Sequence, residues 1–225
     1  MKSELPEESR TQISTLEALL DRIQQGEGTV SNLWIQDLSV APSQLEEQLF
    51  SLYDSAELSF CNVVFENCRW AGCVLERCSF VDTVFRNCDF SNSSLAGGYW
   101  RGCIWQSGKW MGANLSEGVL RQGRLENVNF QYGNLSGCRL QSLQLLQCDL
   151  SRTDLSQCNL KAVGLKDCRL SGCNFFKTPL RGLDFSNCLL EAPILSDSFQ
   201  ELKGAVVNSS QAVELAGLLG LLVRD

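Results

Sequence analysis

Large apolar residues recur at every fifth position along most of this 225-residue chain. From Phe60 to Leu195, every position that is a multiple of five holds Phe, Trp or Leu, and the register never slips. A helix repeats every ~3.6 residues and a strand every ~2, so neither regular element produces this spacing. A short fixed period that persists over many repeats instead predicts a solenoid, in which each repeat packs against its neighbours.

Small residues form a second column, two positions before each large residue. Of the 12 cysteines, all but Cys61 fall in this column, where they alternate with Gly, Ala, Ser, Thr and Val. Cysteines 20 positions apart, such as Cys148 and Cys168, would stack closely enough for a disulfide. The variety of the column favours the other interpretation, in which cysteine is a small buried filler with a free thiol. With no His and no CxxC pair, we expect no metal site.

Tryptophan occupies the large-residue column at four positions, and glycines lie nearby in the small column. The residues are Trp70, Trp100, Trp105 and Trp110. A large indole next to a glycine, which has no side chain, keeps the total volume of the core unchanged. We therefore expect the indoles to lie inside the solenoid rather than to form a surface on which nucleic-acid bases stack.

Asp or Asn often precedes the large residue, as in Ala113-Asn114-Leu115 and Thr153-Asp154-Leu155. This pattern resembles the pentapeptide repeat family, whose consensus is Ala-Asp/Asn-Leu-X-X, and the resemblance covers residues 58–199. It implies a mainly β fold, a right-handed quadrilateral β-helix with four pentapeptides in each square coil. The pattern of residues is consistent with this fold, because each five-residue face can point one large and one small side chain inward. About seven coils at ~4.8 Å each predict a rod of roughly 34 Å.

The ends of a solenoid expose apolar surface and unpaired strand edges, so both ends need caps. We expect residues 1–57 to form a small, mainly α-helical N-terminal cap or docking domain. One helix begins at the capping box Ser14–Glu17 and ends at Gly26, residues 32–40 are extended, and a second helix begins at the capping box Ser43–Glu46. Residues 58–199 form the β-helix, and residues 200–225 add a strand over 202–207 and a capping helix.

The C-terminal helix is expected over residues 211–219, capped by Ser209 or Ser210. It is apolar on most sides. One face can cover the last coil, and a second face indicates another subunit. The topoisomerase-binding members of the family also end in a helix through which they dimerise, so the resemblance implies a tail-to-tail homodimer. The candidate dimer residues are Val213, Leu215, Ala216, Leu218 and Leu219.

The net charge of −7 is unevenly distributed. Residues 1–57 have a net charge of −8, residues 58–195 of +3, and residues 196–225 of −2. The face centred on Phe60 carries a candidate interaction ladder of five cations. Such a row could bind an acidic partner, a nucleic acid or an anionic membrane, or only keep a flat sheet soluble. We expect no direct nucleic-acid binding, because no exposed aromatics are interleaved with the cations. The ladder consists of Arg101, Arg121, Arg139, Lys161 and Arg181.

These features predict a non-enzymatic protein–protein interaction scaffold that needs no cofactor and acts in the bacterial cytoplasm. The chain lacks His and a phosphate-binding Gly motif, its N-terminus is too polar for a signal peptide, and no apolar run reaches the ~18 residues of a membrane span. The alternative follows from the resemblance. Family members that imitate duplex DNA bind DNA gyrase, a type II topoisomerase, and confer quinolone or toxin protection. The slightly basic rod argues against this alternative.

Overall fold

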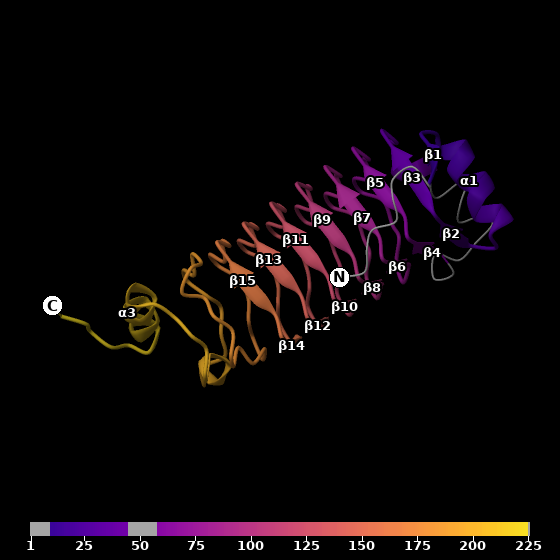
Figure 1. Ribbon diagram of the computed structural model, residues 1–225. Helices are drawn as coiled ribbons and strands as arrows, with labels where there is room; N and C mark the ends of the chain where they lie inside the picture. The colour runs from indigo at the N-terminus through magenta and orange to yellow at the C-terminus, as the bar shows by residue number, and fades with distance from the viewer. Residues whose placement is uncertain (1–9, 45–57, 225) are drawn as a thin grey trace.

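The computed structural model describes residues 10–44 and 58–224, and these form an elongated rod of stacked rungs with a helix near each end (Figure 1). Two sides of the rod are parallel sheets of eight and seven strands. The eight-stranded sheet contains β1 (Thr11–Ile13), β3 (Leu33–Gln36), β5 (Val64–Glu66), β7 (Val84–Arg86), β9 (Ile104–Gln106), β11 (Arg124–Glu126), β13 (Gln144–Leu146) and β15 (Gly164–Lys166). The seven-stranded sheet contains β2 (Thr29–Ser31), β4 (Ser59–Cys61), β6 (Ser79–Val81), β8 (Tyr99–Arg101), β10 (Val119–Arg121), β12 (Arg139–Gln141) and β14 (Asn159–Lys161).

Successive rungs are 20 residues apart and in register. Phe60 pairs with Phe80, and Phe80 with Trp100, in the seven-stranded sheet. The other two sides are held by isolated parallel bridges, such as Arg69 with Asp89 and Ser94 with Asn114. Each coil therefore has four sides of five residues, which confirms the predicted quadrilateral β-helix. Among the described residues, no helix is long and apolar enough to cross a membrane.

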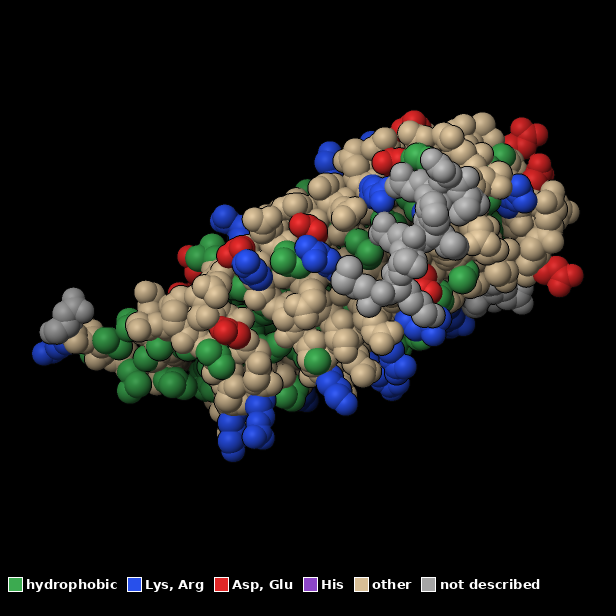
Figure 2. Space-filling view, viewed as in Figure 1, with side chains coloured by type: hydrophobic (Ala, Val, Ile, Leu, Met, Phe, Trp, Pro, Cys, Tyr) green, Lys and Arg blue, Asp and Glu red, His purple; other side chains and the backbone are tan. Residues whose placement is uncertain are grey.

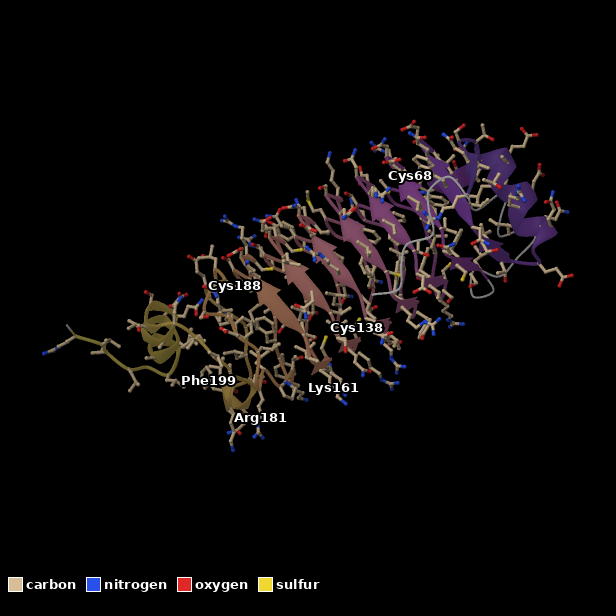
Figure 3. The ribbon with its side chains drawn as sticks, viewed as in Figure 1. Cys68, Cys138, Lys161, Arg181, Cys188 and Phe199 are labelled. Atoms are coloured by element: carbon tan, nitrogen blue, oxygen red, sulfur yellow. The ribbon has the colours of Figure 1, made fainter. Side chains whose placement is uncertain are left out.

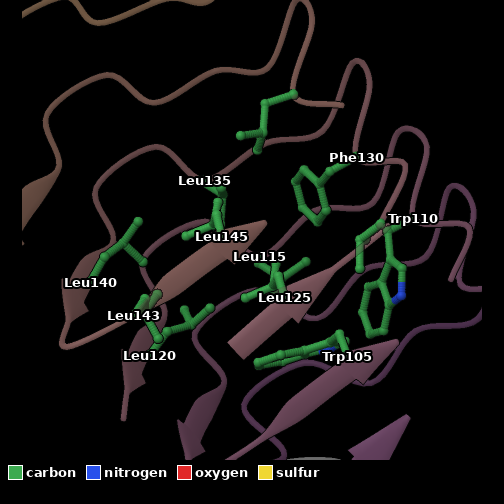
Figure 4. A pocket seen from close by; sticks show the side chains of 12 residues that line it. Trp105, Trp110, Leu115, Leu120, Leu125, Phe130, Leu135, Leu140, Leu143 and Leu145 are labelled. Atoms are coloured by element: carbon green, nitrogen blue, oxygen red, sulfur yellow. The ribbon is translucent and has the colours of Figure 1, made fainter. Parts of the chain in front are cut away.

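The interior changes from aromatic to aliphatic along the rod. Near the N-terminal end the rings stack in columns, with centroids 5.1 Å apart for Phe60 and Phe80 and 4.1 Å for Phe80 and Trp100. All four predicted tryptophans are buried, as expected. Beyond Trp110 the column is mostly Leu, which fills the square less completely. A cavity of about 30 Å³ remains there, lined only by apolar side chains such as Trp105, Leu125 and Leu145 (Figure 4).

The small column contributes hydrogen bonds as well as the right volume. The Thr83 hydroxyl donates to the Phe60 carbonyl at 3.1 Å, and the Ser93 hydroxyl donates to the Trp70 carbonyl at 2.6 Å. The Cys88 and Cys103 thiols donate to the equivalent carbonyls, each 23 residues earlier. All 12 cysteines are free thiols. Cys, Ser and Thr suit this column because each is small and carries one donor for a carbonyl of the preceding coil.

From residue 62 to residue 182, each corner of the square places one residue in the left-handed region, two positions after the large residue. Examples are Asn67 and Asn87, with φ of 52° and 49°. Asn, Asp and Gly adopt this conformation at the lowest cost, which explains their frequency at the corners. The side chains also stack, since Asn87 Nδ2 donates to Asn67 Oδ1 at 2.9 Å and Asn67 Nδ2 donates to Asp37 Oδ1 at 3.1 Å.

The parallel sheets extend across the predicted boundary between residues 57 and 58. Strand β2 pairs with β4, which places Val30 against Phe60, and β3 pairs with β5 and β1. Helix α1 (Leu16–Gln25) follows β1 and buries Leu19 and Ile23. Its N-cap is Thr15, whose hydroxyl accepts from the Ala18 N–H, one residue later than the predicted Ser14.

Residues 32–40 are largely extended, as predicted, because they form β3 and a bridge to the next coil. The predicted second helix lies mostly outside the described residues. At its start, the Gln44 side chain accepts from the Ala41 N–H at 3.0 Å, and the Gln44 N–H donates to the Ala41 carbonyl at 3.1 Å. The helix therefore begins after Ala41 rather than at Ser43, and Ala41 has no side-chain acceptor to complete the predicted capping box.

At the C-terminal end, a 3-10 turn, η3 (Gln200–Leu202), precedes helix α3 (Ser209–Leu218). The strand predicted over residues 202–207 is reduced to one bridge between Asp184 and Val206. The cap of α3 is Asn208 rather than a serine. Its side chain accepts from the Gln211 N–H at 3.0 Å, and the Gln211 side chain accepts from the Asn208 N–H at 2.9 Å. This reciprocal capping box determines where α3 begins.

Candidate interaction surfaces

Helix α3 is joined to the rod by hydrogen bonds near its N-terminus. Asn208 Nδ2 donates to the Ser186 carbonyl at 2.9 Å. Gln211 Nε2 donates to the carbonyls of Phe185 at 2.9 Å and Cys188 at 2.8 Å. One turn later, Glu214 accepts from the Ala192 N–H at 2.9 Å. The rest of the helix projects beyond the last rungs (Figure 1).

The apolar side chains of α3 remain largely exposed. Val213 is 50% exposed, Leu218 40% and Leu219 54%, while Leu215 and Ala216 are half-buried. The buried residue of α3 is the polar Gln211. The prediction that one apolar face covers the last coil is therefore wrong, because α3 is attached through polar contacts and leaves its apolar residues uncovered.

The exposed apolar surface continues on both sides of α3. After the helix, Leu221, Leu222 and Val223 are exposed, with Leu222 at 90%. Before the helix, the last rungs expose Leu189, Ile194 and Val206. Figure 2 shows hydrophobic side chains gathered at this end of the molecule. We call these six residues, together with Val213, Leu218 and Leu219 of α3, the C-terminal apolar surface.

Four cations of the predicted basic ladder lie on the seven-stranded sheet, Arg181 follows beyond its last strand, and all five side chains are exposed. Arg101 pairs with Arg121, Arg121 with Gln141, and Gln141 with Lys161. Thr178 lies over Cys158, which places Arg181 one rung beyond Lys161. In Figure 3, Lys161 and Arg181 extend from the same side of the rod.

Arg139 belongs to a neighbouring column of the same face. It pairs with Val119 and Asn159, at the start of β12, whereas the other four cations follow the large residue. Strand β12 is also the strand that carries Gln141, where the main column has no charge. Each of five consecutive rungs therefore contributes one cation to this face.

A second charged column has a different composition. On the side that carries Trp70, the bridged residues Arg69, Asp89 and Lys109 alternate in sign. Further along, Arg169 Nε lies 3.9 Å from Asp149 Oδ2. Within the described residues, the ion pairs are this one and Arg124–Glu126, and neither includes a residue of the basic ladder. In the part of the chain that the structure describes, the ladder is thus a row of like charges without ion-paired carboxylates.

One buried carboxylate organises the turn before α3. Glu201 is 4% exposed and accepts hydrogen bonds from the N–H groups of Lys177 at 2.8 Å and Ser196 at 3.3 Å, and from the Ser196 hydroxyl at 2.9 Å. Burial disfavours the charged form, but the hydrogen bonds outweigh burial and lower the pKa of Glu201 below its ordinary value. Sequence reasoning missed this residue because one of its donors, the Lys177 N–H, lies 24 residues earlier in the chain.

Burial raises the pKa of several thiols in the core. It raises the pKa of Cys103 and of Cys138 to about 12, and raises the pKa of Cys173 likewise to about 12. At neutral pH these side chains are protonated donors rather than nucleophiles or metal ligands. Among the described residues, no group of three or more Cys, Asp or Glu is arranged to hold a metal ion.

Comparison with solved structures finds proteins with low sequence identity to this chain. QnrB1, described as a plasmid-mediated fluoroquinolone resistance protein, is 18% identical over 86% of this chain and 100% of its own, with a TM-score of 0.41. HetL, described as involved in heterocyst differentiation regulation in Nostoc sp. strain PCC 7120, is 18% identical over 88% and 98%, with a TM-score of 0.39. At these scores the likeness carries no argument about function.

The repeat region also matches a family model. No curated protein matches the chain. The family model of pentapeptide repeats matches in eight copies, over residues 56–97, 111–142, 143–175 and 153–191, which together exceed half of the chain. With its unbroken five-residue register and its coils of 20 residues, the chain belongs to the pentapeptide repeat family.

Proposed function

We propose that this protein is a non-catalytic interaction scaffold, a rigid rod that pairs with a second copy through the C-terminal apolar surface. The observation that carries the proposal is the exposure of Val213, Leu218 and Leu219 on a helix attached through polar contacts. A contiguous exposed apolar surface of this kind is typical of an interaction site.

The charge pattern favours a second copy as the occupant. From Leu215 to Val223 the chain contains no charged residue, and Glu214 and Arg224 flank this segment. In a two-fold symmetric contact the same surface meets itself, so an uncharged apolar surface can pair without repulsion between like charges. Two rods joined at this end would present their flat faces outward, in a cytoplasm whose reducing conditions keep the 12 thiols free.

Sedimentation velocity tests the dimer. We expect the full chain to sediment at twice its mass of 25.0 kDa, and we expect a Leu218→Asp, Leu222→Asp variant and a chain truncated after Asn208 to be monomers. A Val74→Asp, Met111→Asp variant is the matched control, since these exposed apolar residues lie on the rod away from α3. A monomeric full chain, or equal dissociation of the control, would contradict the proposal.

The alternative, proposed from the family resemblance, is that the protein binds a type II topoisomerase. A gyrase supercoiling assay with a quinolone distinguishes this function from that of a scaffold with another partner. Protection of supercoiling by this protein supports the alternative, and unchanged inhibition at saturating protein supports a scaffold with another partner.

A further inference from the structure

We propose that the basic ladder is a docking surface for an extended acidic polypeptide segment that lies along the rod axis. The inference deepens the proposed scaffold function, because it names the chemistry of a partner. It concerns the seven-stranded face and not α3, so its test does not depend on whether the protein dimerises.

Among the described residues, no carboxylate forms an ion pair with the ladder. Like charges directly opposite each other on neighbouring strands destabilise a sheet, and Arg101 stands opposite Arg121 in register. On the side that carries Trp70, the same fold alternates Arg69, Asp89 and Lys109, which removes the repulsion. The one acid of the ladder face, Asp82, lies at a corner one rung before Arg101, at the end of the row. An anion that binds along the row would relieve the repulsion.

The length of the ladder matches that of a short extended polypeptide. Five consecutive rungs supply one cation each, so the row is about 19 Å long at ~4.8 Å per rung. An extended polypeptide advances ~3.4 Å per residue and directs every second side chain to the same face. About seven residues with Asp or Glu at alternate positions therefore match the length of the row. Four carboxylates would then meet five cations whose long side chains can adjust by a few ångströms.

Nucleic acid fits the same surface less well. Duplex DNA curves away from a flat face, so a straight row of cations this short reaches few phosphates, and the described part of the face has no projecting element to enter a groove. Single strands are held largely by stacking on exposed aromatics. The aromatic residue beside the ladder, Tyr99, is half-buried in β8.

Fluorescence anisotropy tests the proposal on the full chain. The probe is a labelled peptide with alternating Glu and Ser over about 15 residues, at low ionic strength, and the same peptide with Gln in place of Glu is the negative control. We expect saturable binding of the Glu peptide that weakens as salt rises. An Arg121→Gln, Lys161→Gln variant should bind about threefold to thirtyfold more weakly, since each exposed ion pair contributes little.

A Lys109→Gln, Arg169→Gln variant is the matched control. It removes the same charge from exposed cations of the alternating column and should bind within about twofold of the unchanged chain. Equal weakening by both variants would show that only net charge matters and would overturn the proposal. Failure of the Glu peptide to bind at low salt would overturn it, as would tighter binding of a single-stranded or duplex DNA of equal charge.

Discussion

Alkaline pH should unfold this protein through its buried thiols. Burial raises the pKa of Cys78, Cys103, Cys138 and Cys173 to about 12, from an ordinary value of 9.0. Because the folded-state pKa lies above the unfolded value, the stabilisation is fully present below about pH 9 and is lost as the pH rises toward 12. Neutral thiols in the core thus make the fold sensitive to base.

The size of the effect follows from the shift. At about pH 10 a thiol in the unfolded chain is largely ionised, while a buried thiol in the folded chain is not. Because this pH lies about one unit above the ordinary thiol pKa, the free energy of unfolding falls by ~1.4 kcal/mol per thiol. Four thiols together give ~6 kcal/mol. Domains of this kind are stable by only about 5–15 kcal/mol, so the loss is a large fraction of the total.

Denaturant unfolding, followed by the fluorescence of the buried tryptophans, measures this loss at about pH 7 and pH 10. The matched variant replaces all four cysteines with Ser. Serine keeps the hydrogen bond to the preceding coil, as Ser93 does, and does not titrate. We expect the variant to lose much less stability than the natural chain between the two pH values, because the two chains differ only at these four side chains. Equal losses in the two chains would refute the reasoning.

Two further predictions concern single positions. Glu201→Gln should destabilise the C-terminal turn at neutral pH and remove its acid sensitivity. The lowered pKa of Glu201 means that its stabilisation is present above about pH 4.5 and is lost as the pH falls, which thermal melts at about pH 7 and pH 3.5 can compare. Gly133→Ala should lower the free energy of unfolding by about 1–3 kcal/mol, because a Cβ there would overlap the Phe130 ring. Comparison of melting temperatures tests this, and Gly217→Ala is the control because a Cβ at Gly217 meets open space.

Much of the rod could be predicted from the sequence, because a five-residue period has one structural solution. The large residues lie inside wherever the register is unbroken, and the tryptophans are buried as expected. The first rungs were missed although Val30, Ile35 and Val40 follow the same register. Val30 pairs with Phe60 at a spacing of 30 rather than 20 residues, so the inserted segment conceals the repeat.

The candidate surfaces were only partly predictable. The basic ladder follows from counting by 20, since the register alone stacks those positions. Arg139 falls on the same face by the same count, two positions before the gap at Gln141. The corner stacks of Asn67 and Asn87 were missed because the left-handed corner, which brings those amides together, is a property of the coil rather than of any single repeat.

The five-residue register alone identifies the side chains that line the tube, since alternatives would place Phe, Trp and Leu in water at a large cost in free energy. The way α3 meets the rod became visible only in the folded chain. Its composition is compatible with covering the last coil, but Asn208, Gln211 and Glu214 are hydrogen-bonded to the final rungs and direct the helix outward. The physical reason is that a register specifies burial within a repeat, whereas the placement of a single unrepeated helix depends on contacts between residues far apart in the chain.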